Sequence, residues 1–251
     1  MAKITPDRNK MDAVGRLAGG AAHDLNNILG AIEGYATLMQ NSLPPGDPAR
    51  QDLDEIRKAV SKAARLTKTF FIFGLKTPMQ RGTASLRAAA EKLRSREAEL
   101  AARGIKLELE LDLAPGPQDV TGDPARLDLL LEHLLSNASD AMPSGGTLAV
   151  AARPAELEPE AVKSVDPAGA GTVFCRLSVR DTGTGIPPEN LPNIFEPFFT
   201  TKEKGKGTGL GLAVVYGIAR QSNGWVEAES EPGKGSEFSV FLPAAPRPAG
   251  V

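Results

Sequence analysis

Residues 181–186 read Asp-Thr-Gly-Thr-Gly-Ile, and residues 205–212 read Gly-Lys-Gly-Thr-Gly-Leu-Gly-Leu. The second segment runs directly into a helical pattern that includes Val214 and Ile218. Backbone N–H groups at the start of a helix bind phosphate well, and glycines let the preceding loop fold around the anion. One glycine-rich loop is a weak signal, so the prediction of a phosphate-binding loop depends on the segments around it.

The first segment follows an apolar strand pattern that ends at Asp181. A buried carboxylate at this position can accept the amino proton of adenine, while Gly183 and Gly185 let the backbone approach the base closely. Ile186 would then pack on the ring. Taken alone, the segment fits a simple Asp-Gly turn at the end of a strand equally well.

A helix is predicted from Asp123-Pro124, an N-cap followed by proline at the first helical position, to Pro143. One of its faces carries His133, Asn137 and Asp140, next to an apolar stripe. The neutral amide oxygen of Asn137 is a suitable ligand for Mg²⁺, which prefers oxygen and keeps several waters.

Helices alternate with strands from residue 82 onward. Alternating apolar residues predict strands near 105–111, 147–153, 172–180, 225–230 and 236–242, and a helix from Leu86 to Gly104. This mixture predicts an α+β two-layer sandwich over residues 82–243. We expect 154–171 to form a loop and 244–251 a frayed tail.

Residues 8–77 have a different pattern, with apolar residues at three- and four-residue spacing. They predict two long helices, each with one buried stripe: Met11, Val14, Leu17, Ala21, Leu25, Ile28, Ile32, Tyr35 and Met39 in the first, and Leu53, Ile56, Val60, Ala63, Leu66, Phe70 and Phe73 in the second. Pro44 and Pro45 end the first helix and separate it from the second. One hairpin has too little partner surface to bury both stripes, so we expect a homodimer that forms a four-helix bundle.

His23 lies about 200° from the stripe residues Ala21 and Leu25 at 100° per residue, so it projects away from the bundle core. An exposed imidazole can attack a phosphoryl group if one ring nitrogen is unprotonated. Asp24 could hold the opposite N–H, and Asn27, one turn further on, could orient a water or a phosphoryl oxygen. A lone histidine on a solvated face would by itself be an ordinary surface residue.

Five segments in one order resemble the boxes of sensor histidine kinases. They are His23-Asp24-Leu25-Asn26-Asn27, Asn137-Ala138-Ser139-Asp140-Ala141, Asp181 to Ile186, Glu196-Pro197-Phe198-Phe199-Thr200-Thr201-Lys202, and Gly205 to Leu212. The resemblance covers nearly the whole chain. The first box is similar to the His-Asp-Phe-Asn-Asn class, with Leu25 in place of phenylalanine, and the second half resembles a GHKL or Bergerat-type ATP-binding domain.

The resemblance implies a nucleotide site for ATP and Mg²⁺, with Asn137 as the metal ligand. It further implies that Gly207, Thr208, Gly209, Leu210, Gly211, Leu212 and Ser236 contact the nucleotide, together with Asp140, Asp181, Gly183, Gly185 and Ile186. Many such kinases have asparagine where this chain has His133, which puts a metal role for His133 in doubt. Some have a basic residue where this chain has Asp140; Lys202, with Lys204 and Lys206, can supply that charge.

The resemblance implies an ATP-dependent protein-histidine kinase that phosphorylates itself on His23, with Asp24 and Asn27 completing the catalytic group. The phosphoryl group would pass to an aspartate on a separate response regulator, because this sequence contains no receiver-like segment. Asn27 also makes phosphatase activity toward that regulator plausible.

Two other functions stay open. Related GHKL ATP hydrolases share the Asn-Ala-x-Asp-Ala and Asp-x-Gly-x-Gly segments, but they place a glutamate general base four residues before the asparagine, where this chain has His133. A non-catalytic nucleotide-binding scaffold would retain the dimerising hairpin and a degenerate nucleotide domain.

Composition excludes several other classes. The net charge of −2 and 5% aromatic content give little basis for nucleic-acid binding. One cysteine excludes an intrachain disulfide and a cysteine zinc cluster. No run approaches the ~20 apolar residues of a membrane span, and the N-terminus lacks a signal peptide, so we expect a cytoplasmic protein. It would be either a kinase without its own sensor or the catalytic portion of something longer.

Overall fold

The structure is a computed structural model that describes residues 1–74, 82–113, 119–155, 173–203 and 207–245. The chain separates into two compact units. One is Arg8–Thr77, and the other combines Met1–Asp7 with Pro78–Val251. The first seven residues therefore belong with the second half of the chain, which the sequence patterns did not predict.

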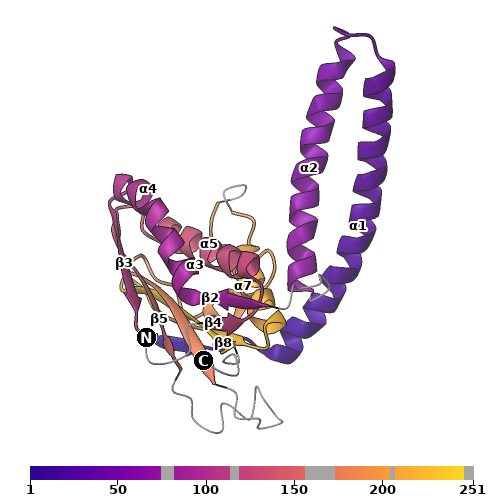
Figure 1. Cartoon of the computed structure of the whole chain (residues 1–251). Coiled ribbons are helices and arrows are strands. Elements are labelled where there is room, and N and C mark those ends of the chain that lie inside the picture. The colour runs from indigo at the N-terminus through magenta and orange to yellow at the C-terminus, as the bar shows by residue number, and fades with distance from the viewer. Residues whose placement is uncertain (75–81, 114–118, 156–172, 204–206, 246–251) are drawn as a thin grey trace, which may run out of the picture. The chain divides into compact units, whose positions relative to one another are not determined.

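The first unit is a helical hairpin of α1 (Arg8–Ser42) and α2 (Ala49–Phe73), which lie side by side and antiparallel (Figure 1). Gly46 turns the chain between them with a φ of 90°, and the Asp47 carboxylate accepts a hydrogen bond from the Ala49 N–H at 2.9 Å. Arg57 on α2 reaches Glu33 on α1 at 2.8 Å. The two predicted helices and their connection are confirmed.

The predicted apolar stripes are not both buried within one hairpin, as expected from the small partner surface that one hairpin offers. Small residues of α1 pack against α2, since Gly15, Gly19 and Ala22 are buried. Much of the first stripe is exposed instead: Leu17, Leu25, Ile28, Ile32, Tyr35 and Met39. Two helices cover only part of each other's surface, so an apolar face is left on the outside of the pair.

The second unit is built on a six-stranded sheet in the order β1-β7-β8-β6-β5-β3. Its strands are β1 (Ala2–Ile4), β3 (Ile105–Leu111), β5 (Gly146–Pro154), β6 (Phe174–Asp181), β7 (Trp225–Glu231) and β8 (Gly235–Pro243). Only the pair of β3 with β5 is parallel among the described strands of this sheet. A second ladder joins β2 (Thr83–Ser85) to β4 (Asp119–Thr121).

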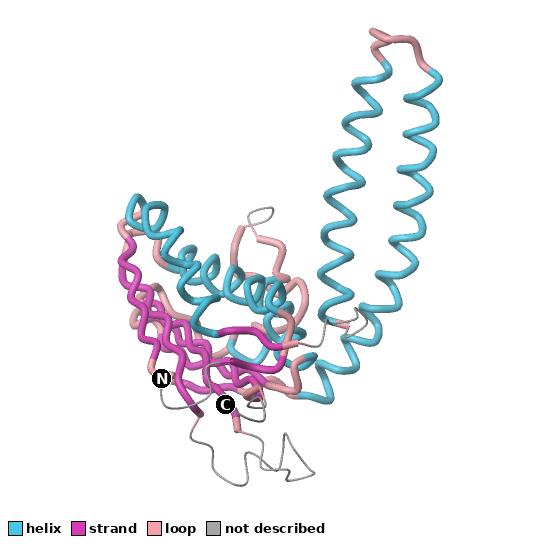
Figure 2. The backbone as a smooth tube through the Cα atoms, in the orientation of Figure 1, coloured by secondary structure: helices cyan, strands magenta, loops and turns pink. Residues whose placement is uncertain are grey.

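Helices gather on one face of this sheet, which gives the predicted two-layer sandwich (Figure 2). They are α3 (Leu86–Lys92), α4 (Glu97–Ala102), α5 (Pro124–Ala141) and α7 (Gly211–Gln221), with short 3₁₀ turns at Leu93–Arg96 and Leu191–Asn193. The single helix predicted from Leu86 to Gly104 is wrong, because the 3₁₀ turn divides it. There the Ser95 hydroxyl donates to the Lys92 carbonyl at 2.6 Å and competes with the helical hydrogen bonds.

Other boundaries differ little from the predictions. The predicted loop at 154–171 and tail at 244–251 fall almost wholly outside the described residues, although Pro154 ends β5 and Ala244 bridges to Val120. Cys175 is buried in β6, where burial raises the pKa of its thiol to about 11. It is a small, neutral core residue at neutral pH.

The strand β1 covers the edge of β7. Lys3 lies opposite Glu229 in the register, and its ammonium contacts the carboxylate of Glu227 at 2.8 Å. The Glu227 hydrogen bond raises the pKa of Lys3. An added strand hides an edge that would otherwise expose unpaired backbone groups.

The close approach of β8 to β6 at Gly235, just after the turn from β7, can be tested by substitution. At Gly235, φ is 90° and an added Cβ would lie 2.0 Å from the Asp181 carbonyl oxygen. Gly235→Ala is therefore expected to lower the free energy of unfolding by about 2 kcal/mol or more. Denaturant unfolding can be followed by fluorescence of Trp225, the single tryptophan.

Gly233→Ala is the matched control. Its φ of 77° is equally unusual, but no atom lies within 4 Å of an added Cβ. The control should lose only about 1 kcal/mol, from the backbone conformation alone. Equal losses at both positions would contradict the close approach of Gly235 to β6.

Candidate functional site

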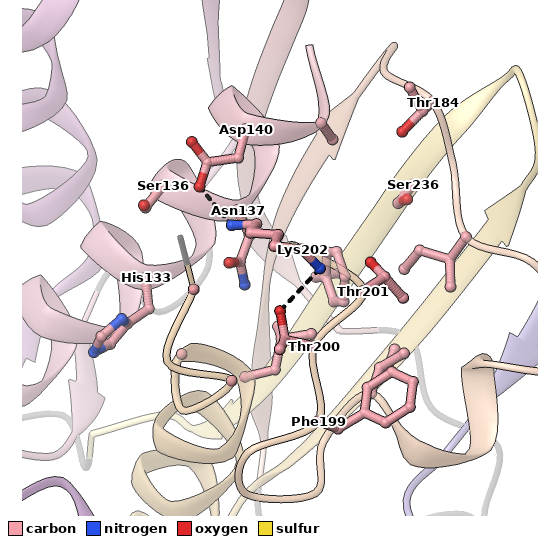
Figure 3. A pocket seen from close by; sticks show the side chains of 18 of the residues that line it. His133, Ser136, Asn137, Asp140, Thr184, Phe199, Thr200, Thr201, Lys202 and Ser236 are labelled. Atoms are coloured by element: carbon pink, nitrogen blue, oxygen red, sulfur yellow. Dashed lines mark hydrogen bonds and ion pairs between the residues drawn. The ribbon is translucent and has the colours of Figure 1, made fainter. Parts of the chain in front are cut away.

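A cavity of about 530 Å³ lies in the second unit, between α5, the ends of β6 and β8, and the segments before α7 (Figure 3). This volume is within the usual range for small-molecule sites. It is lined by His133, Ser136, Asn137, Asp140, Ala141, Asp181, Thr184, Gly185, Ile186, Pro187, Ile194, Phe199, Thr200, Thr201, Lys202, Gly207, Thr208, Gly209, Gly211, Leu212, Ser236 and Phe238.

One end of the cavity contains the Asp181 carboxylate, which is 2% exposed. Burial raises the pKa of this carboxyl group, and hydrogen bonds from the backbone of Gly183 and Ser236 partly offset the shift. The Gly183 N–H donates to Oδ1 at 2.8 Å. The carboxylate is thus a fixed acceptor with apolar neighbours, among them Ile186 and Phe238, in the same lining.

The other end contains the start of α7. Gly211 is its first residue, and an added Cβ there would lie 3.5 Å from Nδ1 of His133 and 3.6 Å from the amide of Asn137. The N-cap residue Leu210 makes no side-chain cap hydrogen bond. The first N–H groups of a helix carry partial positive charge, so this end of the cavity suits an anion.

Positive charge reaches the same end from the segment that precedes the glycines. The Nζ atom of Lys202 lies 2.5 Å from Oδ2 of Asp140, and the Lys202 N–H donates to the Thr200 hydroxyl at 3.2 Å (Figure 3). Phe198, with a φ of 68°, donates its N–H to the Gly209 carbonyl at 2.8 Å and joins the two segments. Lys204 and Lys206 lie outside the described residues.

His133 lines the cavity one helical turn before Asn137. Burial lowers the pKa of its imidazole, against a smaller opposing effect of Glu132. The ring is therefore neutral at neutral pH. Asn137 supplies an amide oxygen beside it, and the described residues contain no group of three or more His, Cys, Asp or Glu side chains placed to hold a metal.

The structure brings twelve of the fourteen predicted nucleotide-contacting residues to the cavity. Gly183 and Leu210 are the exceptions. Gly183 donates a hydrogen bond to Asp181, which does line the cavity, and Leu210 is the N-cap residue of α7. Sequence reasoning did not single out Ser136, Pro187 or Ile194, and it gave no role to Thr184, which lies inside the segment from Asp181 to Ile186. Ser136 and Pro187 directly adjoin the quoted segments, so a wider window around each segment would have included them.

The first unit presents His23 on α1 with 68% of its side chain exposed. Two groups approach the same ring nitrogen, Nδ1: Asp24 Oδ1 at 3.5 Å and Asn27 Nδ2 at 3.3 Å. Asp24 can accept only if Nδ1 carries a proton, whereas the Asn27 amide can donate only if it does not. On α2 the buried Thr67 hydroxyl donates to the neighbouring Asn26 and fixes this turn of α1 against its partner helix.

The buried carboxylate predicts a pH-dependent cost to folding. Since the pKa of Asp181 is raised above 3.8, the stability that its protonated form contributes is present below pH 3.8 and is lost as pH rises through the folded-state pKa. At pH 7 Asp181→Asn should therefore be more stable than the parent chain, and this advantage should vanish near pH 3.8. Unfolding monitored by Trp225 fluorescence across pH measures the difference.

Glu132→Gln removes an exposed carboxylate from α5 and should show no such pH-dependent gain. An Asp181→Asn chain that is less stable than the parent at pH 7 would contradict a net cost of burial.

Comparisons with known proteins match both units. Residues 13–74 match the His Kinase A (phospho-acceptor) domain, and residues 122–246 match the Histidine kinase-, DNA gyrase B-, and HSP90-like ATPase family. Sensor kinase CckA of Brucella abortus (strain 2308) is 40% identical over 93% of this chain and 24% of that protein. Sensor histidine kinase ZraS of Escherichia coli (strain K12) is 33% identical over 94% of this chain and 47% of that protein.

Solved structures show the same fold. The catalytic domain of histidine kinase ThkA is 26% identical and has a TM-score of 0.52, over 67% of this chain and all of that one. Full-length ShkA in complex with AMPPNP has a TM-score of 0.61 at 21% identity, over 92% of this chain and 46% of that one. The chain spans less than half the length of the two curated relatives. It belongs to the histidine kinases, as a catalytic core with a phosphoacceptor domain and a GHKL-type ATP-binding domain.

Proposed function

We propose that this chain phosphorylates itself on His23 with ATP and passes the phosphoryl group to an aspartate of a response regulator. The observation that carries the proposal is that one chain contains two complementary sites. One is the exposed imidazole of His23 with its polar neighbours, and the other is a cavity with a hydrogen-bond acceptor at one end and a helix N-terminus suited to an anion at the other. Both domains belong to a family of kinases that use these two parts.

In the proposed complex, adenine lies at the Asp181 end and the phosphates lie against the start of α7. Asp181 accepts the adenine amino proton, and Ile186 packs on the ring. Gly207 to Leu212 surround the phosphates with backbone N–H groups. Asn137 would hold Mg²⁺ through its amide oxygen, since this metal prefers oxygen ligands. When bound, the metal supplies charge neutralisation on the phosphates.

At His23, the proposed mechanism needs Nδ1 protonated and Nε2 free. Asp24 accepts the Nδ1–H, and the Asn27 side chain turns its amide oxygen toward the same hydrogen. Nε2 attacks the γ-phosphorus as the bond to the β,γ-bridging oxygen breaks, and ADP leaves with that electron pair. Such transfers depend on positioning and electrostatic stabilisation more than on covalent catalysis by the protein.

The acceptor of the phosphoryl group is proposed to be a response regulator with a receiver domain. A kinase of similar fold, ThkA, has been solved in complex with the response regulator TrrA. Asn27 beside His23 is placed to orient a water as well as a phosphoryl oxygen, so we extend the proposal to phosphatase activity toward the regulator.

The exposed apolar face of the hairpin supports a homodimer. Ile28, Ile32 and Tyr35 on α1 and Ile56 and Leu66 on α2 are all exposed in one copy. Large contiguous apolar surfaces mark association sites in soluble proteins. A second copy of residues 8–77 would bury them in a four-helix bundle.

Among the described residues, no helix is both long enough and apolar enough to cross a membrane.

The structure favours phosphoryl transfer over the alternative of an ATP hydrolase. Such a hydrolase needs a carboxylate base that faces the cavity, yet position 133 is an imidazole whose pKa is lowered. Glu132 is exposed and is absent from the lining. The scaffold alternative requires a degenerate nucleotide site, whereas the predicted polar residues gather around one cavity.

His23→Ala should abolish incorporation of label from γ-labelled ATP while leaving AMPPNP affinity within about twofold, because the imidazole is the acceptor and lies outside the cavity. Labelling is measured by denaturing gel and affinity by calorimetry. His133 is the only other histidine in the chain. Label that persists at the parental level in the His23→Ala chain would refute the mechanism.

Ile28→Glu should weaken dimerisation by about tenfold or more, since it places a charge in the proposed apolar interface. Light scattering over a dilution series measures the monomer fraction. Arg65→Glu is the control: it lies nine residues, or about two and a half turns, from Ile56, on the opposite face of α2. Equal effects of both substitutions, or a monomeric parent chain at micromolar concentration, would contradict the dimer.

A further inference from the structure

Lys202 and Asp140 form an ion pair at the anion-binding end of the cavity. The two charged atoms lie 2.5 Å apart, and each side chain is 38% exposed. Figure 3 shows Asn137 beside this pair. The lysine comes from the segment before the glycines and the aspartate from α5, so the pair fastens that segment to the helix that carries the proposed metal ligand.

The position of Lys202 is set by its stem as well as by its charge. An added Cβ at Gly207 would lie 3.0 Å from Cδ and 3.4 Å from Cβ of Lys202, so the stem rests against the first described glycine of the phosphate-binding segment. The stem is flexible, so rotation about its bonds can move the ammonium from one anion to another without moving the backbone.

Asp140 has a second cation near it. The Nη2 atom of Arg103 lies 3.8 Å from Oδ1 of Asp140 and donates to the Ser139 carbonyl at 3.0 Å. The carboxylate therefore keeps a positive neighbour if Lys202 turns away. Lys202 in turn gains a stronger partner, because a terminal phosphate carries more charge than a carboxylate.

We propose that Asp140 is an internal counter-ion of Lys202, and that the terminal phosphate of a nucleoside triphosphate competes with Asp140 for this lysine. Asp140 is then a positioning residue. It holds the lysine at the phosphate end of the cavity, and the lysine is released to the nucleotide only when a γ-phosphate is present. Lys202 thereby favours triphosphate over diphosphate, and Asp140 lowers that preference by competing for the lysine. This inference rests on the proposed nucleotide site.

A double-mutant cycle tests the competition. Dissociation constants for AMPPNP and ADP, each with Mg²⁺, are measured by calorimetry for the parent chain, Asp140→Asn, Lys202→Gln and the double variant. Asp140→Asn should tighten AMPPNP binding by about fivefold, the upper range for a partly exposed ion pair, and ADP binding by less than about twofold. Lys202→Gln should weaken AMPPNP binding more than ADP binding.

The sign of the coupling separates competition from simple repulsion. If Asp140 only repels phosphate, its repulsion is strongest without the lysine, so Asp140→Asn would tighten AMPPNP binding more in the Lys202→Gln background. If Asp140 competes for the lysine, the gain in that background falls below about twofold. An equal or larger gain there, or weaker AMPPNP binding by Asp140→Asn alone, overturns the inference.

Glu132→Gln is the matched control, because it removes the same charge from an exposed position on α5 that does not line the cavity. It should leave both affinities within about 1.5-fold. Failure of the parent chain to bind either nucleotide would sink the proposed function itself. Normal parental binding with the wrong coupling would sink only the role of Asp140.

Discussion

The tight contact between the end of β6 and the start of β8 is the constraint on which the nucleotide site depends. Gly235 approaches the Asp181 carbonyl so closely that no side chain fits between the strands, and the Asp181 carboxylate is buried beside this contact. Backbone N–H groups offset only part of the cost of burying the charge, so its pKa stays raised. The strands hold a costly acceptor in a fixed place, as a binding site for a hydrogen-bond donor requires.

Much of the fold follows from local periodicity. The long helices, the strand at 105–111 and the sandwich all come from apolar spacing that lies within one segment. The short strands at Ala2–Ile4, Thr83–Ser85 and Asp119–Thr121 could not be predicted, because three residues carry too little pattern and their pairing is tertiary. The apolar faces of the hairpin were predictable from spacing, but what covers them was not, since periodicity identifies an apolar face without showing its partner.

The residues of the site likewise differ in how far local sequence could predict them. Asp181 and Asn137 were predictable because their motifs place functional atoms at fixed offsets within one element. The pair of Asp140 with Lys202 joins residues 62 positions apart, and only the fold brings them together. The sequence comparison treated Asp140 as the loss of a positive charge, whereas the structure shows it as the partner of one. The lowered pKa of His133 likewise results from burial by surrounding elements.

The neutral state of His133 bears on the choice between transfer and hydrolysis. A general base works best when its pKa lies near the working pH, and burial moves this imidazole to a lower value. It is therefore a weaker base toward water than an ordinary histidine. His23, by contrast, is exposed on a separate unit, and Asp24 and Asn27 both approach its Nδ1, which leaves Nε2 for the proposed attack. The two histidines of the chain thus have opposite environments: the one in the cavity is buried with a lowered pKa, and the one on the helix is exposed, as the proposed phosphoacceptor requires.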